Sequence, residues 1–390
     1  MKLDLLAKAP PVDVIVYYSG KGSDFISRVV LKEISHRILA APRGSKKTNT
    51  LYLSLAVATQ FARLLPLAIK DLPDLPSLEK LKLVVGNTIR VYQLATILAF
   101  RPKVVITWVD TSFDFQWMSR QVATPKFYAI ANSPRDETHI VDEMPHRLPH
   151  PGGVFYIPNY FVYGPNDRDV FVRHSQEIEK FHLVGPLRYG YYLTQLKKKP
   201  MVPVFDICLI SQYVAQIFEG GDLPDVAESL KRLHAYLARY IEETGLKLVV
   251  ALRSNTEKEI NYFCSVFNNS AVLQANSFEN MTTYHVMDRS RLIISHSSTA
   301  AQNAFGIGQR VLFTNYSKNK RLSFFAKGVW MDEDGGYLSF CEKIQRLLSM
   351  DSSEYDELTT GARAKFMTFD PKCPAHEAIR SEILKEISVG

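Results

Sequence analysis

Short apolar runs of strand length recur along the first half of the chain, separated by longer stretches. Val14–Tyr18, Val104–Trp108 and Phe127–Ile130 are apolar almost throughout, as expected of strands that are buried on both faces. The stretches between them are long enough for helices, so the pattern predicts a parallel sheet covered by helices on both sides. Further elements expected in this half are strands at Leu81–Val85, Tyr160–Tyr163 and His182–Val184, and a helix from Asp24 to Leu39.

The alternation of strands and helices begins again after Gln195–Pro203. This segment is basic, bounded by proline and without periodicity, which is typical of a linker. We therefore expect Rossmann-like domains over residues 1–197 and 198–373, and a C-terminal helix over 374–390 that is able to cross back to the first domain. The elements expected in the second half are strands at Phe205–Ile210, Lys247–Leu252, Ala271–Leu273, Leu292–Ser295, Arg310–Phe313 and Val329–Met331, and helices at Leu223–Thr244 and Pro374–Ile387.

Two Rossmann-like halves are typical of the GT-B fold of nucleotide-sugar glycosyltransferases. The turn Ser19–Ser23 follows the first strand, but it lacks the third glycine of a dinucleotide-binding motif and the lysine-serine ending of a P-loop. Dehydrogenases and P-loop enzymes are therefore not favoured. The predicted fold class is α/β, GT-B, with two Rossmann-like domains whose parallel sheets face a cleft.

The longest apolar run in the chain is Leu51–Ile69. It contains Thr59, Gln60, Arg63 and Pro66, which would be costly or disruptive in the middle of a bilayer. We expect a buried helix that ends near Pro66, and no transmembrane span. The first residues lack the apolar core of a signal peptide, and the four cysteines show no zinc or disulfide spacing. A cytoplasmic protein is expected, peripheral at the inner membrane at most.

The composition favours a globular protein with anionic partners. Apolar residues make up 46% and charged residues 22%, and the net charge of +7 suits nucleotides, nucleic acid or an anionic membrane. The basic loop Pro42–Asn49 could touch lipid headgroups, or it could simply be solvated. The stretch Arg188–Tyr192 could stack on bases, but the chain contains no recognised nucleic-acid module. We therefore expect this stretch to pack inside the protein, and no nucleic-acid partner.

The stretch Leu292–Asn315 is the strongest candidate for a binding site. A strand, a polar turn, a short Ala-rich helix that stops at Gly306 and a second strand follow one another. The partial positive charge and free N–H groups of a helix start suit a phosphate, although an ordinary helix cap explains the same residues. The residues expected to contact a nucleotide are the turn residues His296, Ser297, Ser298 and Thr299, together with Asn303 on the helix and Arg253 after the strand Lys247–Leu252.

Three carboxylates are candidate catalytic residues by position. Asp110 and Glu137 follow predicted strands, and ligands of open α/β sheets bind beyond the carboxyl ends of strands. Asp222 follows a Gly-Gly turn and could project into the cleft, although it could equally cap the next helix. Turn chemistry alone also explains Asp110 and Glu137. Asp332–Asp334 matches a metal-binding DxD only superficially, so we expect neither a metal nor a cofactor.

Five segments together resemble bacterial surface-carbohydrate biosynthesis transferases. The chain is most similar to the retaining β-Kdo transferase modules that build lipopolysaccharide O-antigen or capsule. The resemblance implies a GT-B fold, CMP-β-Kdo as the donor substrate, and a glycan acceptor carried on a lipid at the inner membrane face. It spans most of the chain, and the segments that carry it are Ile106–Phe115, Tyr160–Phe171, His182–Gly190, Phe205–Gln212 and Ser295–Phe313.

The resemblance also implies roles for individual residues. The turn Ser297–Thr299 would hold the CMP phosphate. Asp222 would be the nucleophile of a double displacement, and Glu137 would assist deprotonation of the acceptor. The Kdo carboxylate would meet basic or polar side chains, for which the candidates are Arg253, Arg135, Lys21 and Ser19.

Two other interpretations stay open. Many GT-B enzymes place a ribose-binding glutamate after the phosphate turn, where this chain has Asn303. A GT-B transferase that uses a UDP- or GDP-sugar is the first alternative. A non-catalytic carbohydrate-binding scaffold is the second.

Overall fold

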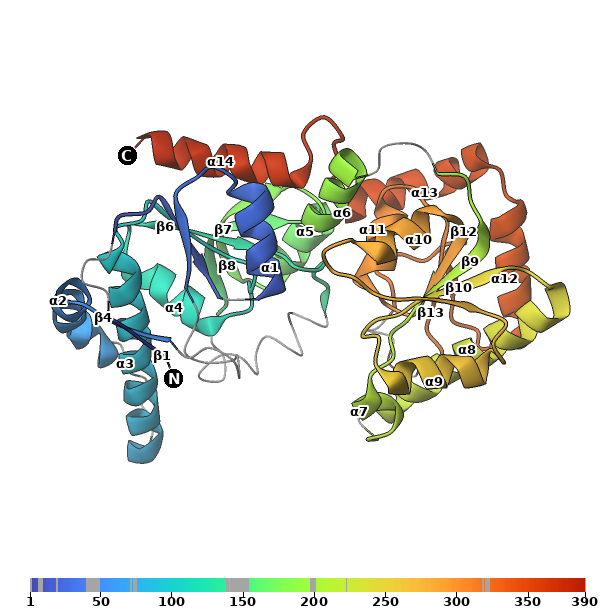
Figure 1. The fold of residues 1–390 in the computed structure, drawn as a ribbon, viewed down its shortest axis with the longest axis horizontal. Coiled ribbons are helices and arrows are strands. Elements are labelled where there is room, and N and C mark those ends of the chain that lie inside the picture. Colours follow the sequence, from blue (N-terminus) through green and yellow to red (C-terminus); the bar gives the residue numbers. More distant parts are fainter. Residues whose placement is uncertain are drawn as a thin grey trace. The chain divides into compact units, whose positions relative to one another are not determined.

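The computed structural model describes residues 2–5, 10–18, 20–39, 50–70, 72, 76–137, 140, 154–196, 201–221, 223–317, 319 and 323–389. The chain divides into two compact units, Met1–Val184 with Cys373–Gly390 and Gly185–Lys372. Each unit contains a six-stranded sheet in which every pair of neighbouring strands is parallel (Figure 1). Helices connect the strands, as parallel pairing requires.

The sheet of the first unit has the strand order β3-β2-β5-β6-β7-β8. Its strands β2 and β5 are completely buried, which explains why they read as continuous apolar runs. The chain moves from β2 outward to β3 and then returns to the other side of β2 with β5. The strands are β2 (Val14–Tyr17), β3 (His36–Leu39), β5 (Val104–Thr107), β6 (Lys126–Ile130), β7 (Tyr156–Val162) and β8 (Glu177–Leu183).

Helices and a small two-stranded sheet surround this first sheet. The last helix of the chain, α14, packs against the π-helical turn Ile26–Val30 and β5, and Arg380 donates a hydrogen bond to the carbonyl of Val30 at 2.9 Å. Tyr128 also donates to Glu386 at 3.2 Å. The other elements are β1 (Lys2–Leu5), β4 (Thr50–Leu53), α1 (Lys21–Phe25), α2 (Leu55–Leu64), the 3₁₀ turn Leu65–Ala68, α3 (Ser77–Ala99), α4 (Phe113–Gln121), α5 (Pro165–Arg173) and α14 (Ala375–Val389).

Three predictions for the first unit are wrong. The expected strand Leu81–Val85 lies inside the long helix α3, and the second half of the expected helix Asp24–Leu39 is strand β3. A short apolar run fits either element, and the surrounding structure decides between them. The run Leu51–Ile69 does contain a helix that ends before Pro66, but of the residues of α2 only Val57 is buried. No helix in the described part of the chain is long and apolar enough to cross a membrane.

The sheet of the second unit has the order β11-β10-β9-β12-β13-β14. All the strands expected here are confirmed, with ends that differ by a residue or two. They are β9 (Phe205–Ile210), β10 (Leu248–Ala251), β11 (Val272–Gln274), β12 (Ser290–Ser295), β13 (Val311–Thr314) and β14 (Met331–Asp332).

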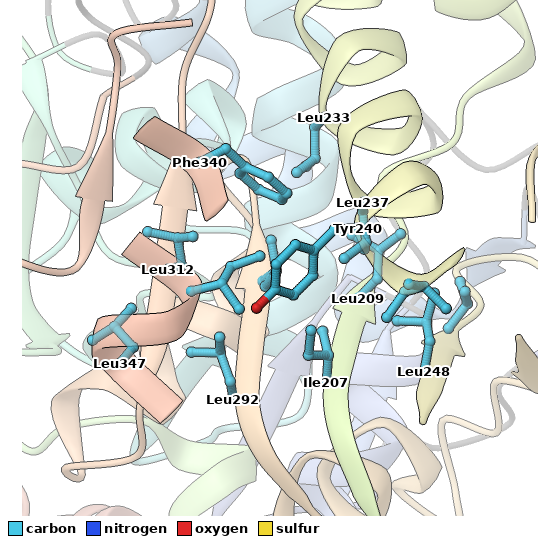
Figure 2. Close-up of a cluster of buried hydrophobic side chains, with 14 of the residues drawn as sticks. Ile207, Leu209, Leu233, Leu237, Tyr240, Leu248, Leu292, Leu312, Phe340 and Leu347 are labelled. Carbon is cyan, nitrogen blue, oxygen red and sulfur yellow. The ribbon is translucent and has the colours of Figure 1, made fainter. Parts of the chain in front are cut away.

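A core of aliphatic and aromatic side chains joins this sheet to helices α8 and α12. Figure 2 shows Leu209 and Leu292 from the sheet beside Leu237 and Tyr240 of α8 and Phe340 of α12. All of these side chains are at most 3% exposed, so this core anchors the central strands. The helices of the unit are α6 (Leu187–Tyr191), which continues as the π-helical turn Tyr192–Leu196, α7 (Ala215–Phe218), α8 (Pro224–Thr244), α9 (Glu257–Val266), α10 (Thr282–Asp288), α11 (Thr299–Gly306), α12 (Tyr337–Ser349) and α13 (Ser352–Phe366).

Candidate functional site

The second sheet reverses its strand order between β9 and β12. The chain runs from β9 outward to β10 and β11, and then returns to the opposite side of β9 with β12. The connections after β9 and β12 therefore leave the sheet in opposite directions. Open α/β sheets bind ligands beyond the carboxyl ends of the strands at such a reversal. The segment after β12 is the polar turn at residues 296–299.

A single amide side chain holds this turn. Oε1 of Gln212, just beyond β9, accepts hydrogen bonds from the backbone N–H of His296 at 3.0 Å, from that of Ser297 at 2.9 Å and from the hydroxyl of Ser295 at 3.0 Å. Its Nε2 donates to the Ser297 hydroxyl at 3.1 Å. Gln212 thus uses both ends of its amide to fix the turn to the neighbouring strand.

The start of α11 has backbone N–H groups that are available as hydrogen-bond donors. The N–H of Ser298 donates to Ser295 at 3.1 Å, and that of Ala300 donates to the Ser298 hydroxyl at 3.3 Å, so Ser298 is the N-cap. The N–H of Gln302 makes the first helical hydrogen bond. Among the described residues, the N–H groups of Thr299 and Ala301 have no acceptor. Two unsatisfied donors at a fixed helix start form an anion-binding arrangement.

His296 lies buried behind the turn. Its side chain is 2% exposed, its Nδ1 lies 3.2 Å from the Ser297 hydroxyl, and its Nε2 has no hydrogen-bond partner of normal geometry in the described part of the chain. Burial lowers the pKa of His296 to about 4, and the nearby Asn315 offsets this only in part. The imidazole is therefore neutral at pH 7, and the positive end of the site comes from backbone dipoles.

Asn303 and Arg253 occupy contrasting environments. Asn303 is 2% exposed on α11, and its Oδ1 is buried with no partner among the described residues. The side chain of Arg253 is exposed, while its backbone N–H donates to Oε1 of Glu259 at 2.7 Å and its carbonyl accepts from Asn276 at 2.6 Å. The backbone at Arg253 is therefore fixed and its guanidinium faces solvent.

Sequence reasoning missed two residues that organise these loops. Gln212 ends the segment Phe205–Gln212, and its polarity directly after a buried strand was a usable signal. Glu259 lies completely buried and accepts hydrogen bonds from Ser211, Arg253, Ser254 and Asn255. Burial works to raise the pKa of Glu259, but these hydrogen bonds lower it below its ordinary value. Its sequence position within α9 gave no such signal.

The carboxyl edge of the first sheet contains a buried ion pair. Arg135, after β6, is 4% exposed, and its guanidinium donates to Asp110, after β5, through Nε at 2.9 Å and Nη2 at 2.6 Å. The hydroxyl of Tyr160 on β7 also donates to Asp110. Asp110 is completely buried, so these contacts favour a structural role for the pair.

A second buried carboxylate extends this network. Asp167 on α5 accepts hydrogen bonds from the backbone N–H groups of Arg135 and Tyr163, both at 3.0 Å. Burial nevertheless raises the pKa of Asp167 to about 7, because two backbone donors only partly replace the lost water. The loop after β6 is therefore fixed through both the side chain and the backbone N–H of Arg135.

Two further predicted residues of the first unit, Glu137 and Lys21, lie at its surface. Glu137 is exposed and forms an ion pair with Arg173. Its Oε1 also lies 3.9 Å from Nε2 of His174. Lys21 is exposed at the start of α1. Asp222 and Ser19 lie outside the described residues. The catalytic roles of Asp110, Glu137 and Asp222 remain predictions.

Two other sequence features belong to the interior of the second unit. Tyr189 and Tyr192 are buried and stack on each other, as the packing interpretation of Arg188–Tyr192 expected. Asp332 is 1% exposed and accepts a hydrogen bond from Tyr316 at 2.6 Å. In the part of the chain that the structure describes, no three His, Cys, Asp or Glu side chains gather as a metal site requires.

No protein-family model and no curated protein sequence matches the chain. Solved structures match it across nearly all of its length. UDP-GlcNAc 2-epimerase from Neisseria meningitidis, bound to UDP-GlcNAc, has a TM-score of 0.54 at 13% identity and covers 100% of both chains. A protein from Listeria monocytogenes assigned as a UDP-N-acetylglucosamine 2-epimerase has a TM-score of 0.58 at 12% identity and covers 97% of this chain and 96% of its own. The wall teichoic acid polymerase TagF has a TM-score of 0.51 at 11% identity. The match covers 97% of this chain and 89% of the TagF chain.

These similarities establish the fold. At such low identity they say nothing about the substrate or the reaction of this chain. Two units, each with a six-stranded parallel sheet flanked by helices, have the GT-B architecture, and the predicted fold class is confirmed.

Proposed function

We propose that this protein is a glycosyltransferase that binds the phosphate of a nucleotide-sugar donor at the start of α11. The observation that carries the proposal is the turn held by Gln212 at the reversal of the second sheet, where the N–H groups of Thr299 and Ala301 have no acceptor in the described part of the chain. The site needs no cation, because fixed dipoles stabilise the charge of the leaving phosphate.

The similarity to the N. meningitidis epimerase supports a nucleotide-sugar ligand in general terms, since that protein is bound to UDP-GlcNAc. For this chain, the resemblance in sequence leads us to propose CMP-β-Kdo as the donor and a lipid-linked surface glycan as the acceptor. Asp222 is the proposed nucleophile of a retaining double displacement, and Glu137 is the proposed base for the acceptor hydroxyl. A UDP- or GDP-sugar transferase is the alternative that keeps the same phosphate contacts.

The decisive variant removes one donor and leaves the helix intact. Proline is favoured at the first position of a helix, and Ser298 before it already has φ −66° and ψ 132°, which a following proline accepts. Thr299→Pro therefore deletes the N–H of residue 299 without breaking α11. Thr299→Ala retains that N–H and removes only the hydroxyl.

The matched control is Ser352→Pro, at the first position of α13, where the preceding Asp351 has φ −75° and ψ 169°. Isothermal titration calorimetry with CMP, UDP, GDP and ADP should show Thr299→Pro weakening nucleotide binding at least about tenfold, as expected for loss of a hydrogen bond to a charged group. Thr299→Ala should lose less nucleotide affinity, and Ser352→Pro should lose none. Equal affinity in the wild type and Thr299→Pro would rule out this phosphate site.

The identity of the nucleotide separates the candidate donors. A preference for CMP supports the Kdo proposal, and a preference for UDP or GDP replaces it with the alternative. The absence of binding by all four nucleotides would make the non-catalytic scaffold the better explanation. With CMP-Kdo as substrate, Asp222→Gln and Glu137→Gln should each lower kcat by about 10²-fold or more while leaving CMP affinity unchanged.

A further inference from the structure

The helix α2 and the turn that follows it expose an apolar stripe. Leu55, Leu65 and Ile69 are 85%, 44% and 64% exposed, and Ala58 and Ala62 between them are exposed as well. Within α2, Leu55, Ala58 and Ala62 have the three- and four-residue spacing of one helix face, whereas Leu65 and Ile69 belong to the 3₁₀ turn that follows. The opposite face of α2 is also apolar and contains the buried Val57. The exposed face of α2 contains only two polar side chains, Thr59 and Arg63, beside these apolar ones.

The first turns of α3 repeat the pattern. Leu78, Leu81 and Val85 are 62%, 59% and 52% exposed and lie three and four residues apart. α2 packs against α3, and Figure 1 shows the beginning of α3 projecting beyond the other described elements of the first unit. We call residues 55–85 the α2–α3 hairpin. Its exposed apolar side chains are concentrated within 31 residues, whereas such residues are usually scattered singly over a surface.

Packing among the described residues of the first unit does not account for these side chains. The inward side of the hairpin is already filled by other residues, such as Val57 and Ala68, each 2% exposed, and by Phe61, whose ring lies 6.4 Å from that of Tyr92. The exposed leucines therefore contribute little to the stability of the unit. Their exposure costs solvation free energy unless an apolar surface covers them.

The charges around the hairpin indicate what that surface is. Arg63 and Lys82 are exposed next to the two apolar stripes. Between residues 34 and 70 the sequence has six Lys and Arg residues and no Asp or Glu, and residues 71–85 add Lys80 and Lys82 together with Asp71, Asp74 and Glu79. The segment 34–85 therefore has a net positive charge. An apolar face flanked by basic residues suits the interface of an anionic lipid membrane, where leucines enter the acyl boundary and cations meet headgroups.

We propose that the α2–α3 hairpin docks the first unit on an anionic membrane. The docking uses Leu55, Leu65, Ile69, Leu78 and Leu81 as inserted side chains and Arg63 and Lys82 as headgroup contacts. The proposal does not depend on the nucleotide site, which lies in the other unit. For a transferase that acts on a lipid-linked acceptor, such docking would hold the enzyme where its acceptor is.

Co-flotation with vesicles tests the proposal on the full chain. Vesicles of phosphatidylcholine with 30% phosphatidylglycerol should carry the protein upward, and pure phosphatidylcholine should carry much less. The double variant Leu55→Ser/Leu81→Ser should bind the anionic vesicles at least about tenfold more weakly, since two leucines no longer insert. Leu338→Ser is the matched control, because Leu338 is 77% exposed on α12 of the second unit.

The charge contribution has its own readout. Arg63→Gln/Lys82→Gln should reduce binding about threefold or more at low salt and little at high salt. Unchanged melting temperatures in all variants would show that the hairpin still folds. Equal flotation of the wild type and the double leucine variant would overturn the proposal. Failure to bind any vesicle, together with self-association that Leu55→Ser/Leu81→Ser abolishes, would replace the membrane with a second copy of the chain.

Discussion

The carboxyl edges of the two parallel sheets both contain polar loops, but the chemistry of these loops is opposite. In the first unit, the loops after β5 and β6 are joined by the buried ion pair of Asp110 and Arg135. In the second unit, the turn after β12 is held by the neutral amide of Gln212. Both arrangements fix a loop to the neighbouring strand.

The difference lies in what remains available for a ligand. Asp110 and Arg135 satisfy each other inside the protein, so that their charges face inward. Gln212 satisfies the turn without charge, and the donors at the start of α11 have no acceptor among the residues that the structure describes. A buried ion pair is costly to desolvate and fixes loop geometry, whereas a neutral clamp preserves the positive end of a helix for an anion. Polar residues after strands therefore do not by themselves show which unit has donors available for a ligand.

The largest effect should come from breaking the ion pair. Arg135→Met leaves Asp110 buried without its partner and should lower the unfolding free energy of the first unit by about 3–5 kcal/mol. Denaturant unfolding followed by the fluorescence of Trp108 and Trp117, in a Trp330→Phe background, reports on this unit. Adding Asp110→Asn should recover most of the loss, because the buried charge is gone and Tyr160 retains an acceptor. A loss below about 1 kcal/mol would contradict the structural role of the pair.

Lowering the pH should change the contributions of Asp167 and His296 to the unfolding free energy in opposite directions. The pKa of Asp167 is raised to about 7, so its contribution to stability is fully present below about pH 4 and is lost as the pH rises through 7. The pKa of His296 is lowered to about 4, so its contribution is present above about pH 6.5 and is lost as the pH falls through 4. Each contribution amounts to about 3–4 kcal/mol over its full window.

Denaturant series at pH 4.5–7.5 measure both contributions as differences between the wild type and a variant. The difference between the wild type and Asp167→Asn should change with pH in the first unit, and that between the wild type and His296→Asn in the second. Because the two pKa values shift in opposite senses, the two slopes should have opposite signs. Slopes of the same sign would mean that at least one of these side chains is solvated in solution.

Removing the neutral clamp should have an intermediate effect. Gln212→Met leaves the N–H groups of His296 and Ser297 without an acceptor and should lower the stability of the second unit by about 1–3 kcal/mol. Nucleotide affinity should fall at least about tenfold, because the donors at α11 lose their fixed position. Gln212→Glu retains an acceptor oxygen and adds a negative charge, so it should lose affinity with a smaller loss of stability. Calorimetry and unfolding on the same samples separate the two effects.

The smallest effect should come from the exposed pair of Glu137 and Arg173. Arg173→Ala should change the stability of the first unit by less than about 1 kcal/mol, since solvent screens exposed pairs. The measurement is the same unfolding assay as for Arg135→Met. A loss comparable to that of Arg135→Met would show that exposure alone does not distinguish the two pairs.

The sequence was sufficient to predict most of the sheets and the polar turn before α11. Buried parallel strands such as β2, β5 and β9 read as continuous apolar runs, because neither of their faces meets water. The prediction of a strand at Leu81–Val85 was wrong because these residues lie inside a helix of 23 residues, where apolar side chains also recur. The exposure of α2 could not be foreseen, since its pattern is that of a buried helix and its surroundings decide otherwise.

The chemistry around the turn was only partly predictable. The residues at 296–299 are contiguous, so a local pattern identifies them. Gln212 lies more than 80 residues away, and it reaches the turn only because β9 and β12 are neighbours. A local sequence pattern does not predict which strands become neighbours in the sheet. The inward-facing charges of Asp110 and Arg135 were missed for the same reason, since their pairing depends on the adjacency of β5, β6 and β7.

The return of α14 to the first unit sets an order of events during synthesis on the ribosome. Residues 185–372 are contiguous and precede α14, so the second unit can begin to close its core before α14 has left the ribosome. The first unit begins to emerge earlier, yet the Arg380 contact to Val30 and the Glu386 contact to Tyr128 cannot form until the last helix leaves the exit tunnel. The unit that starts first is therefore the one that finishes last, and its apolar surface under α14 stays uncovered in the interval.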